Sequence, residues 1–231
     1  MEAGLVKAAT EVCVVAAATV LGGLAARVGR GAAVTGAGPA PACAQGRGPQ
    51  LAGAALAALA VGSAWQRPLW SGPGAGLSAN VIGLLGVLVW ACLLVAAGVA
   101  DLCWMRVPPA LWRAGAPAVC AGALVGAGTS GYWVAAARGA VVALVGALVY
   151  FTVAVLRPGR LGGADARMAG LVGFGVGAVR PGVAVVCLAV APLACALWGA
   201  VRREGRGRGQ AIALCPFLAV AGVVGVAAGA R

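Results

Sequence analysis

Two aspartates are the residues of this chain best suited to carry out chemistry. Asp101 follows the apolar run 81–100, and Asp165 precedes the apolar run 166–179. A carboxylate at membrane depth costs about 2.5–3.5 kcal/mol on insertion scales, so its presence indicates a function. Two facing carboxyl groups can share a proton, so that one activates a water molecule while the other polarises a carbonyl group. The pair therefore predicts hydrolysis of the aspartic-protease type.

The composition places these aspartates in a membrane protein. The chain is 62% hydrophobic and only 10% charged, whereas soluble domains carry roughly 25% charged residues. We expect one all-α membrane-embedded domain, residues 1–231, with about eight transmembrane segments and a short cytoplasmic loop at 27–50. The expected segments are 4–26, 51–65, 77–100, 110–128, 132–156, 165–179, 182–201 and 211–230. The second and sixth are shorter than the ~20 residues that a span usually needs.

Other kinds of site find little support in the sequence. There is no histidine, and none of the eight cysteines forms a C-x-x-C pair, so we predict no metal and no cofactor. The net charge of +12 comes from basic residues scattered between apolar runs. That distribution is typical of positive-inside membrane topology, so we expect a lipid bilayer and no nucleic acid as a partner.

The distribution of basic residues also predicts an orientation. If eight segments alternate with the N-terminus outside, most basic residues are cytoplasmic. The outside then carries only Lys7, Arg67, Arg138, Arg180 and Arg231. In this topology Asp101 ends a helix that enters the cytoplasm and Asp165 begins one that leaves it. The two aspartates can therefore meet at the cytoplasmic face.

The surroundings of the two aspartates resemble a known family. Asp101 is followed by Val107-Pro108 and then Leu111, with Arg106 just before the pair, and residues 162–168 read GGADARM. In these features the chain resembles the prepilin peptidases, membrane aspartic proteases of the GxGD type. Their first motif is an aspartate followed by an Ile-Pro-like pair and a leucine, and their second is G-x-G-D-x-K-L. Residues 213–219, ALCPFLA, are similar to the family's F-x-P-F-L-A start of the last helix.

The chain departs from the family pattern at three places. Ala164 replaces the second glycine of GxGD, and Arg167 replaces the lysine. If position 164 required a positive φ, an alanine there would cost activity. The tetracysteine zinc-binding segment of larger, bifunctional members is missing, and residues 27–50 occupy its place. The resemblance therefore implies a short, peptidase-only form and does not extend to methyltransferase activity.

The resemblance implies a substrate and a place of action. It implies an endopeptidase of a bacterial inner membrane that cleaves the cytoplasmic leader of prepilin-like precursors. Asp101 and Asp165 would be the catalytic pair, and prepilin-like proteins would be the partners. The supporting positions of the two motifs are Arg106, Pro108, Gly162, Gly163, Ala164 and Arg167.

Other interpretations of these residues stay open at the level of the sequence. The chain could be a small transporter whose carboxylates bind protons or cations, which predicts acids near the bilayer midplane. It could also be an inactive relative that serves as a structural subunit. Asp165 could be a helix N-cap, and Arg106 or Arg167 could set topology or orient a carboxylate. Glu11, inside the first segment, is a weaker functional candidate.

Overall fold

The structure of the chain, a computed structural model, describes residues 77–157, 161–201 and 213–229. Within these ranges the chain forms helices and no strands. The helices are α4 (Leu77–Trp104), α5 (Pro109–Ser130), α6 (Trp133–Leu156), α7 (Gly163–Val179), α8 (Pro181–Val201) and α9 (Cys215–Gly229). The all-α fold class is therefore confirmed for the described part of the chain, whereas the predicted segments 4–26 and 51–65, and Glu11, lie outside it.

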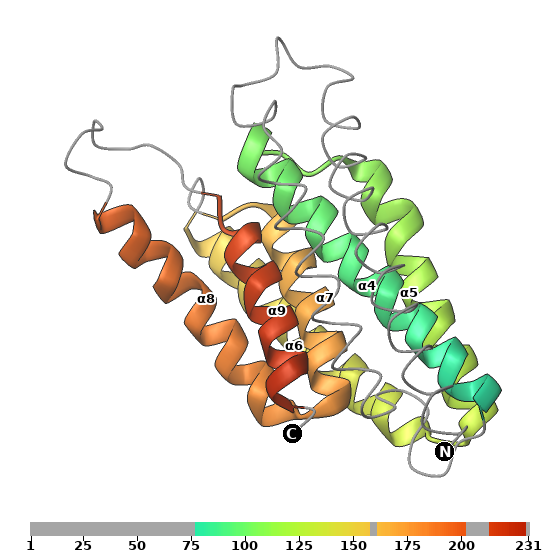
Figure 1. Ribbon diagram of the computed structural model, residues 1–231. Coiled ribbons are helices and arrows are strands. Elements are labelled where there is room, and N and C mark those ends of the chain that lie inside the picture. The colour runs from blue at the N-terminus through green and yellow to red at the C-terminus, as the bar shows by residue number, and fades with distance from the viewer. Residues whose placement is uncertain (1–76, 158–160, 202–212, 230–231) are drawn as a thin grey trace, which may run out of the picture.

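Consecutive helices run in opposite directions along the bundle (Figure 1). The end of α4, the start of α7 and the start of α9 consequently lie at the same end of the molecule, at the top in this view. We call this the site end. The alternation that the sequence predicts for these segments is thus present, and it brings the two aspartates to one end.

Four of the described helices are long and apolar enough to cross a membrane. They are α4 through its window Leu85–Leu102, α5, α6 and α8. With 17 and 15 residues, α7 and α9 are only about 25 and 22 Å long, at 1.5 Å per residue. The described residues therefore indicate a membrane protein with four candidate spans, and the total of eight segments stays a prediction.

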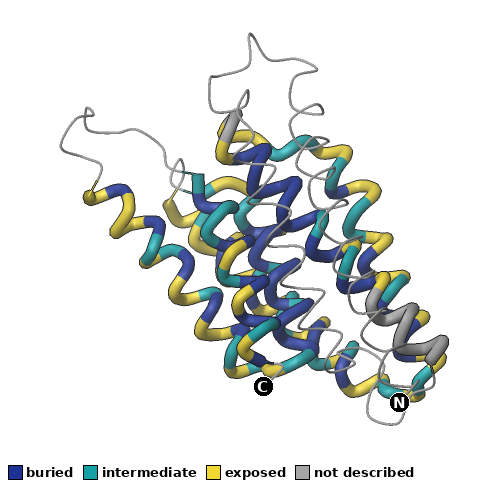
Figure 2. Tube along the Cα trace, in the orientation of Figure 1, coloured by how far each residue is buried: buried dark blue, intermediate teal, exposed yellow. Residues whose placement is uncertain are grey.

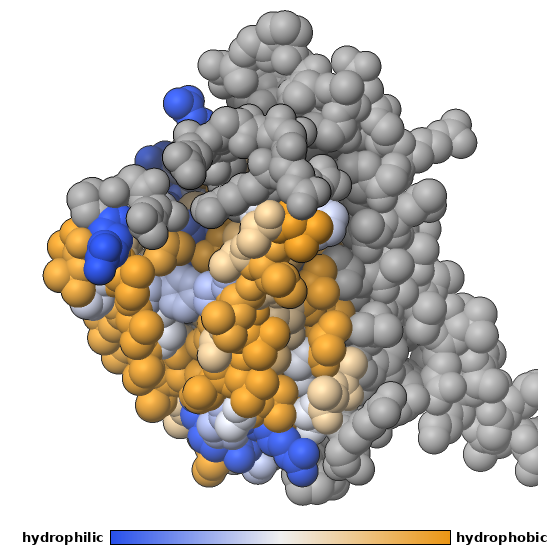
Figure 3. Space-filling model, turned by 90° about the vertical axis from the view of Figure 1, so that its left-hand side faces the viewer, coloured by the Kyte–Doolittle hydropathy of each residue, from blue (hydrophilic) through white to orange (hydrophobic). Residues whose placement is uncertain are grey.

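Burial separates an inner set of helices from an outer set. Most residues of α7 and α9 are buried, and 67% of the α4 window is buried, against 17% of α6 (Figure 2). The outward face of α8 exposes large apolar side chains, among them Val185, Leu193 and Leu197. Figure 3 shows hydrophobic residues over the middle of this side of the molecule and hydrophilic ones towards its two ends. Such an exposed apolar surface fits contact with lipid.

Glycines allow the inner helices to approach one another closely. A methyl group added at Gly139 of α6 would lie 2.7 Å from the Phe174 carbonyl oxygen of α7. Added at Gly173 of α7, it would lie 2.9 Å from the Val142 carbonyl oxygen of α6. Because backbone cannot move aside cheaply, these positions exclude any larger residue, as in other closely packed membrane helices.

A break after Asp101 separates α4 from α5. The sequence predicts it from Pro108 and Pro109, and Pro109 is indeed the first residue of α5. However, the predicted segment ends at Ala100, whereas α4 continues to Trp104. Met105 then adopts a left-handed φ of 54°, and its N–H still donates to the Asp101 carbonyl oxygen at 2.8 Å. Asp101 thus lies within the last turn of α4 instead of following the helix.

One buried polar contact fixes α4 against α7. Trp90 is fully buried, and its indole Nε1–H donates to the Leu171 carbonyl oxygen at 2.7 Å. A side chain at Gly175 would collide with the same indole ring. The hydrogen bond and the ring together set the height of α4 relative to α7, and hence that of Asp101 relative to Asp165.

We expect Trp90→Phe to lower the free energy of unfolding by about 1–2 kcal/mol, because the buried indole hydrogen bond is lost. The midpoint of thermal unfolding in detergent would measure this change. Trp133→Phe is the control, since Trp133 is 53% exposed and its replacement should change the midpoint little. Equal midpoints for the two variants would contradict the role of Trp90.

Candidate active site

Asp101 is the one buried charged residue in the described part of the chain, with 7% of its surface exposed. Its position follows from the small residue one turn earlier. A methyl group added at Gly98 would lie 3.4 Å from the Cα atom of Pro216, so α9 already touches α4 there. The start of α9 therefore lies directly beside the Asp101 carboxyl group.

Asp165 lies at the start of α7, but it is not the N-cap. The N-cap is Gly162, and Asp165 is the third helical residue. Its Oδ2 atom accepts a hydrogen bond at 2.8 Å from the backbone N–H of Gly162. An acidic residue at this position often satisfies a donor that the helix itself leaves unpaired. The side chain is half-buried, so it is more accessible than Asp101.

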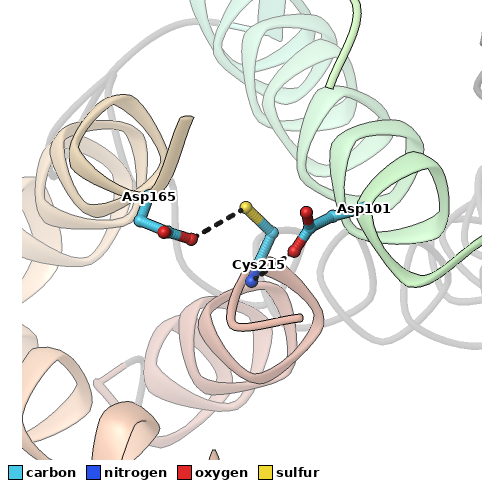
Figure 4. A group of neighbouring side chains, drawn as sticks. All are labelled: Asp101, Asp165 and Cys215. Atoms are coloured by element: carbon cyan, nitrogen blue, oxygen red, sulfur yellow. Dashed lines mark hydrogen bonds between the residues drawn. The ribbon is translucent and has the colours of Figure 1, made fainter. Parts of the chain in front are cut away.

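Cys215, the first residue of α9, lies between the two carboxyl groups (Figure 4). Its backbone N–H donates to Asp101 Oδ2 at 3.2 Å, and its thiol donates to Asp165 Oδ1 at 3.5 Å. One carboxylate oxygen from each aspartate and the Cys215 Sγ atom all lie within 4.8 Å of one another. Sequence reasoning missed this residue because a cysteine in an apolar run behaves as a small hydrophobe. Its position just before Pro216, at the expected start of the last helix, was the available signal.

The backbone N–H of Cys215 is free to bind Asp101 because of how α9 begins. The Leu214 carbonyl oxygen accepts from both Phe217 and Leu218, at 3.0 and 3.2 Å. Pro216 has no N–H, and a proline is tolerated in the first turn of a helix. The N–H of Cys215 is one of the donors that a helix start leaves unpaired. It is therefore available to the buried carboxyl group.

Among the described residues, two backbone N–H groups and one thiol donate to the two aspartates, and no basic side chain does. The positive ends of α7 and α9 both lie at the carboxyl groups, where a helix macrodipole favours negative charge. Arg106 and Arg167 are exposed, and within the described ranges neither donates a hydrogen bond to Asp101 or Asp165. The expectation that one of them could orient a carboxylate therefore finds no support in the geometry.

The remaining motif positions shape the backbone around the aspartates. Pro108 is half-buried and is the N-cap of α5. Gly162 and Gly163 are exposed, and a methyl group added at Gly163 would meet no atom within 4 Å. Ala164 is part of α7, and among the described non-glycine residues only Met105 has a positive φ. Position 164 thus has ordinary helical backbone, which an alanine adopts without strain.

The arrangement permits two kinds of chemistry. Two hydrogen bonds of about 2.8 Å each can span the separation between the carboxylate oxygens, so one water molecule could bind both aspartates. The same two oxygens and the sulfur are spaced so that they could also hold a metal ion, and both atom types are zinc ligands in proteins.

Comparisons of the chain with models of protein families, with curated proteins and with solved structures found no match.

We expect Ala164→Gly to lower the free energy of unfolding by about 0.5–1 kcal/mol, because glycine loses more backbone entropy in a helix. Thermal unfolding in detergent would measure the loss. Gly163→Ala is the reverse control: it lies in the same helical turn, has no positive φ and has open space around it, so it should raise the midpoint. A more stable Ala164→Gly protein would show that position 164 prefers glycine after all.

Proposed function

We propose that the chain is a membrane aspartic endopeptidase that cleaves the leader peptide of prepilin-like precursors. The observation that carries this proposal is the convergence of Asp101 and Asp165, from α4 and α7, at one end of an apolar helical bundle. Their oxygens lie within 4.8 Å, a separation that one hydrogen-bonded water molecule can bridge. The family resemblance of the two motifs adds the class of substrate.

The proposed reaction uses one ionised and one protonated aspartate. The ionised carboxylate takes a proton from the bound water, whose oxygen attacks the carbonyl carbon of the peptide bond. The protonated partner donates a hydrogen bond to the carbonyl oxygen and stabilises the charge that develops there. The tetrahedral intermediate then collapses, the C–N bond breaks, and the leaving amine takes up a proton from the pair. No covalent enzyme intermediate forms.

The substrate would reach the pair from the side of Asp165. Asp101 is buried beneath α9, whereas Asp165 is half-buried and follows the exposed Gly162 and Gly163. Small residues with open space around them let an extended backbone approach a carboxyl group closely. We therefore place the scissile peptide bond along the first turn of α7.

The proposed orientation puts the site end at the cytoplasmic face of a bacterial inner membrane, in a chain of about eight segments. The distribution of arginines among the described residues supports it, because positive charge is more frequent on the cytoplasmic side. The site end has Arg106, Arg113, Arg157 and Arg167, and the opposite end has Arg138 and Arg180. A prepilin leader is expected on that side.

The transporter alternative fits this arrangement less well. It expects acids near the bilayer midplane, whereas Asp101 is in the last turn of α4 and Asp165 in the first turn of α7. The inactive-relative alternative rested on the alanine at position 164, where the helical backbone makes no demand for glycine.

Asp101→Asn and Asp165→Asn should each lower the rate of processing of a co-expressed prepilin at least about 10²–10⁴-fold, because each removes half of a unit that transfers protons. Immunoblots of precursor and mature pilin would measure processing, and membrane fractions would show that both variants are inserted. The double variant should be no slower than either single one, as for other groups that act together.

Glu204→Gln supplies the matched control, because it makes the same chemical change at an acid outside the two motifs, and it should process normally. Full processing by either aspartate variant would reject the proposed pair.

Arg157→Cys should react with a membrane-impermeant maleimide only in inside-out inner-membrane vesicles. Arg180→Cys should react with it only in cells whose outer membrane has been made permeable and whose inner membrane is intact. Both residues are exposed C-caps, of α6 and α7, at opposite ends of the bundle. Labelling above that of the wild-type cysteines is the measurement. The reverse labelling pattern would reject the proposed orientation.

A further inference from the structure

We propose that Cys215 is a positioning residue of the aspartate pair, whose amide and thiol hold the two carboxyl groups one water molecule apart. This inference deepens the proposed function and rests on it. In the family pattern the residue before Pro-Phe-Leu-Ala is not specified, so the role concerns a cysteine particular to this chain.

The two carboxyl groups are linked through Cys215. The backbone N–H of Cys215 reaches Asp101 Oδ2 at 3.2 Å, and its thiol reaches Asp165 Oδ1 at 3.5 Å (Figure 4). The hydrogen bonds therefore run from α4 through the first residue of α9 to α7. A shift of α9 would move both contacts together.

The packing of α9 keeps that first residue in place. A methyl group added at Gly222 would lie 3.1 Å from Val172 of α7 and 3.2 Å from Leu94 of α4, so α9 is wedged between the two helices that carry the aspartates. Cys215 itself has no exposed surface. Its amide is thus a fixed donor, because a buried helix start cannot rotate away.

The thiol differs from the amide in being weak and free to rotate. A thiol is a poor hydrogen-bond donor, and its contact with Asp165 is the longest at the site. Rotation about one side-chain bond would release Asp165 to a water molecule or a peptide while the amide still holds Asp101. Cys215 would therefore set the spacing of the two carboxyl groups in the absence of substrate, and its thiol would rotate away from Asp165 when substrate binds.

Cys187 shows what a purely structural cysteine looks like in the same bundle. It is also buried, and its Sγ atom packs against α9 at Gly225, without a hydrogen bond to either carboxyl group. Cys187→Ala removes the same atoms from a comparable place. It is therefore the matched control for Cys215→Ala.

The first experiment tests the bridge without an activity assay. Infrared spectra of the purified protein contain a thiol S–H stretching band that disappears in Cys215→Ala. In Asp165→Ala this band should move to higher frequency, because the acceptor of the S–H bond is gone, while the band assigned through Cys187→Ala stays in place. An unmoved Cys215 band would overturn the inference.

The second experiment tests the consequence for the reaction with the prepilin processing assay across pH. Cys215→Ala should lower kcat about threefold to tenfold, the effect of one weak hydrogen bond, with KM little changed. The acid limb of the profile should move to higher pH, because the ionised form of the pair loses a donor. Cys215→Ser should restore the position of the limb, and Cys187→Ala should not move it.

The two experiments separate the possible failures. If the wild-type protein processes no prepilin but the infrared band moves, the peptidase proposal fails and the bridge stands. If the wild-type protein is active and Cys215→Ala keeps its pH profile and kcat, the positioning role is wrong.

Discussion

The arrangement of the described helices depends on holding two acidic side chains in an apolar bundle, where no basic side chain of the described residues binds them. Burial of a lone carboxylate is unfavourable unless donors replace the water it loses. Here the donors are the backbone N–H groups of Gly162 and Cys215, at the starts of α7 and α9. Both helix starts direct their positive ends at the carboxyl groups. The two helices that begin beside the acids supply these donors, so the position of each helix start is a requirement of the site.

The inner helices meet that requirement through small residues. Gly98 brings α9 against α4 next to Asp101, and Gly222 lets α9 enter between α4 and α7. The indole of Trp90 fills the space over Gly175 and fixes α4 along α7 by its bond to the Leu171 carbonyl oxygen. Close packing of this kind replaces the hydrophobic effect, which gives little drive for association in lipid. These glycines thus have a definite use: they let α4, α7 and α9 pack closely around the two aspartates.

The sequence could predict the helices and the meeting of Asp101 and Asp165, because hydropathy and proline breaks are strong local signals and alternation fixes which helix ends coincide. It could not predict details that depend on how the helices face one another. In uniformly apolar helices such as α9, no polar stripe marks the packed face. The contact of Cys215 with both carboxyl groups therefore could not be predicted from the sequence. The same limit applies to Trp90 and Leu171. The sequence placed Asp165 at the start of the correct helix, but as a possible N-cap and not as the third helical residue. The two positions differ in backbone geometry, which amino-acid composition does not specify.

The carboxylate oxygens of Asp101 and Asp165 and the Cys215 Sγ atom could bind a cation, or the two carboxyl groups could carry one proton between them. The backbone around them favours the singly protonated pair over the bound cation. A cation would require Cys215 as a thiolate, since the thiolate is the metal ligand. It would also lie at the positive ends of α7 and α9, which attract anions and repel cations. A pair of carboxyl groups that share one proton carries a single negative charge, and the N–H donors of Gly162 and Cys215 are directed at its oxygens. Both helix starts would thus stabilise the singly charged pair on which the proposed peptidase reaction depends.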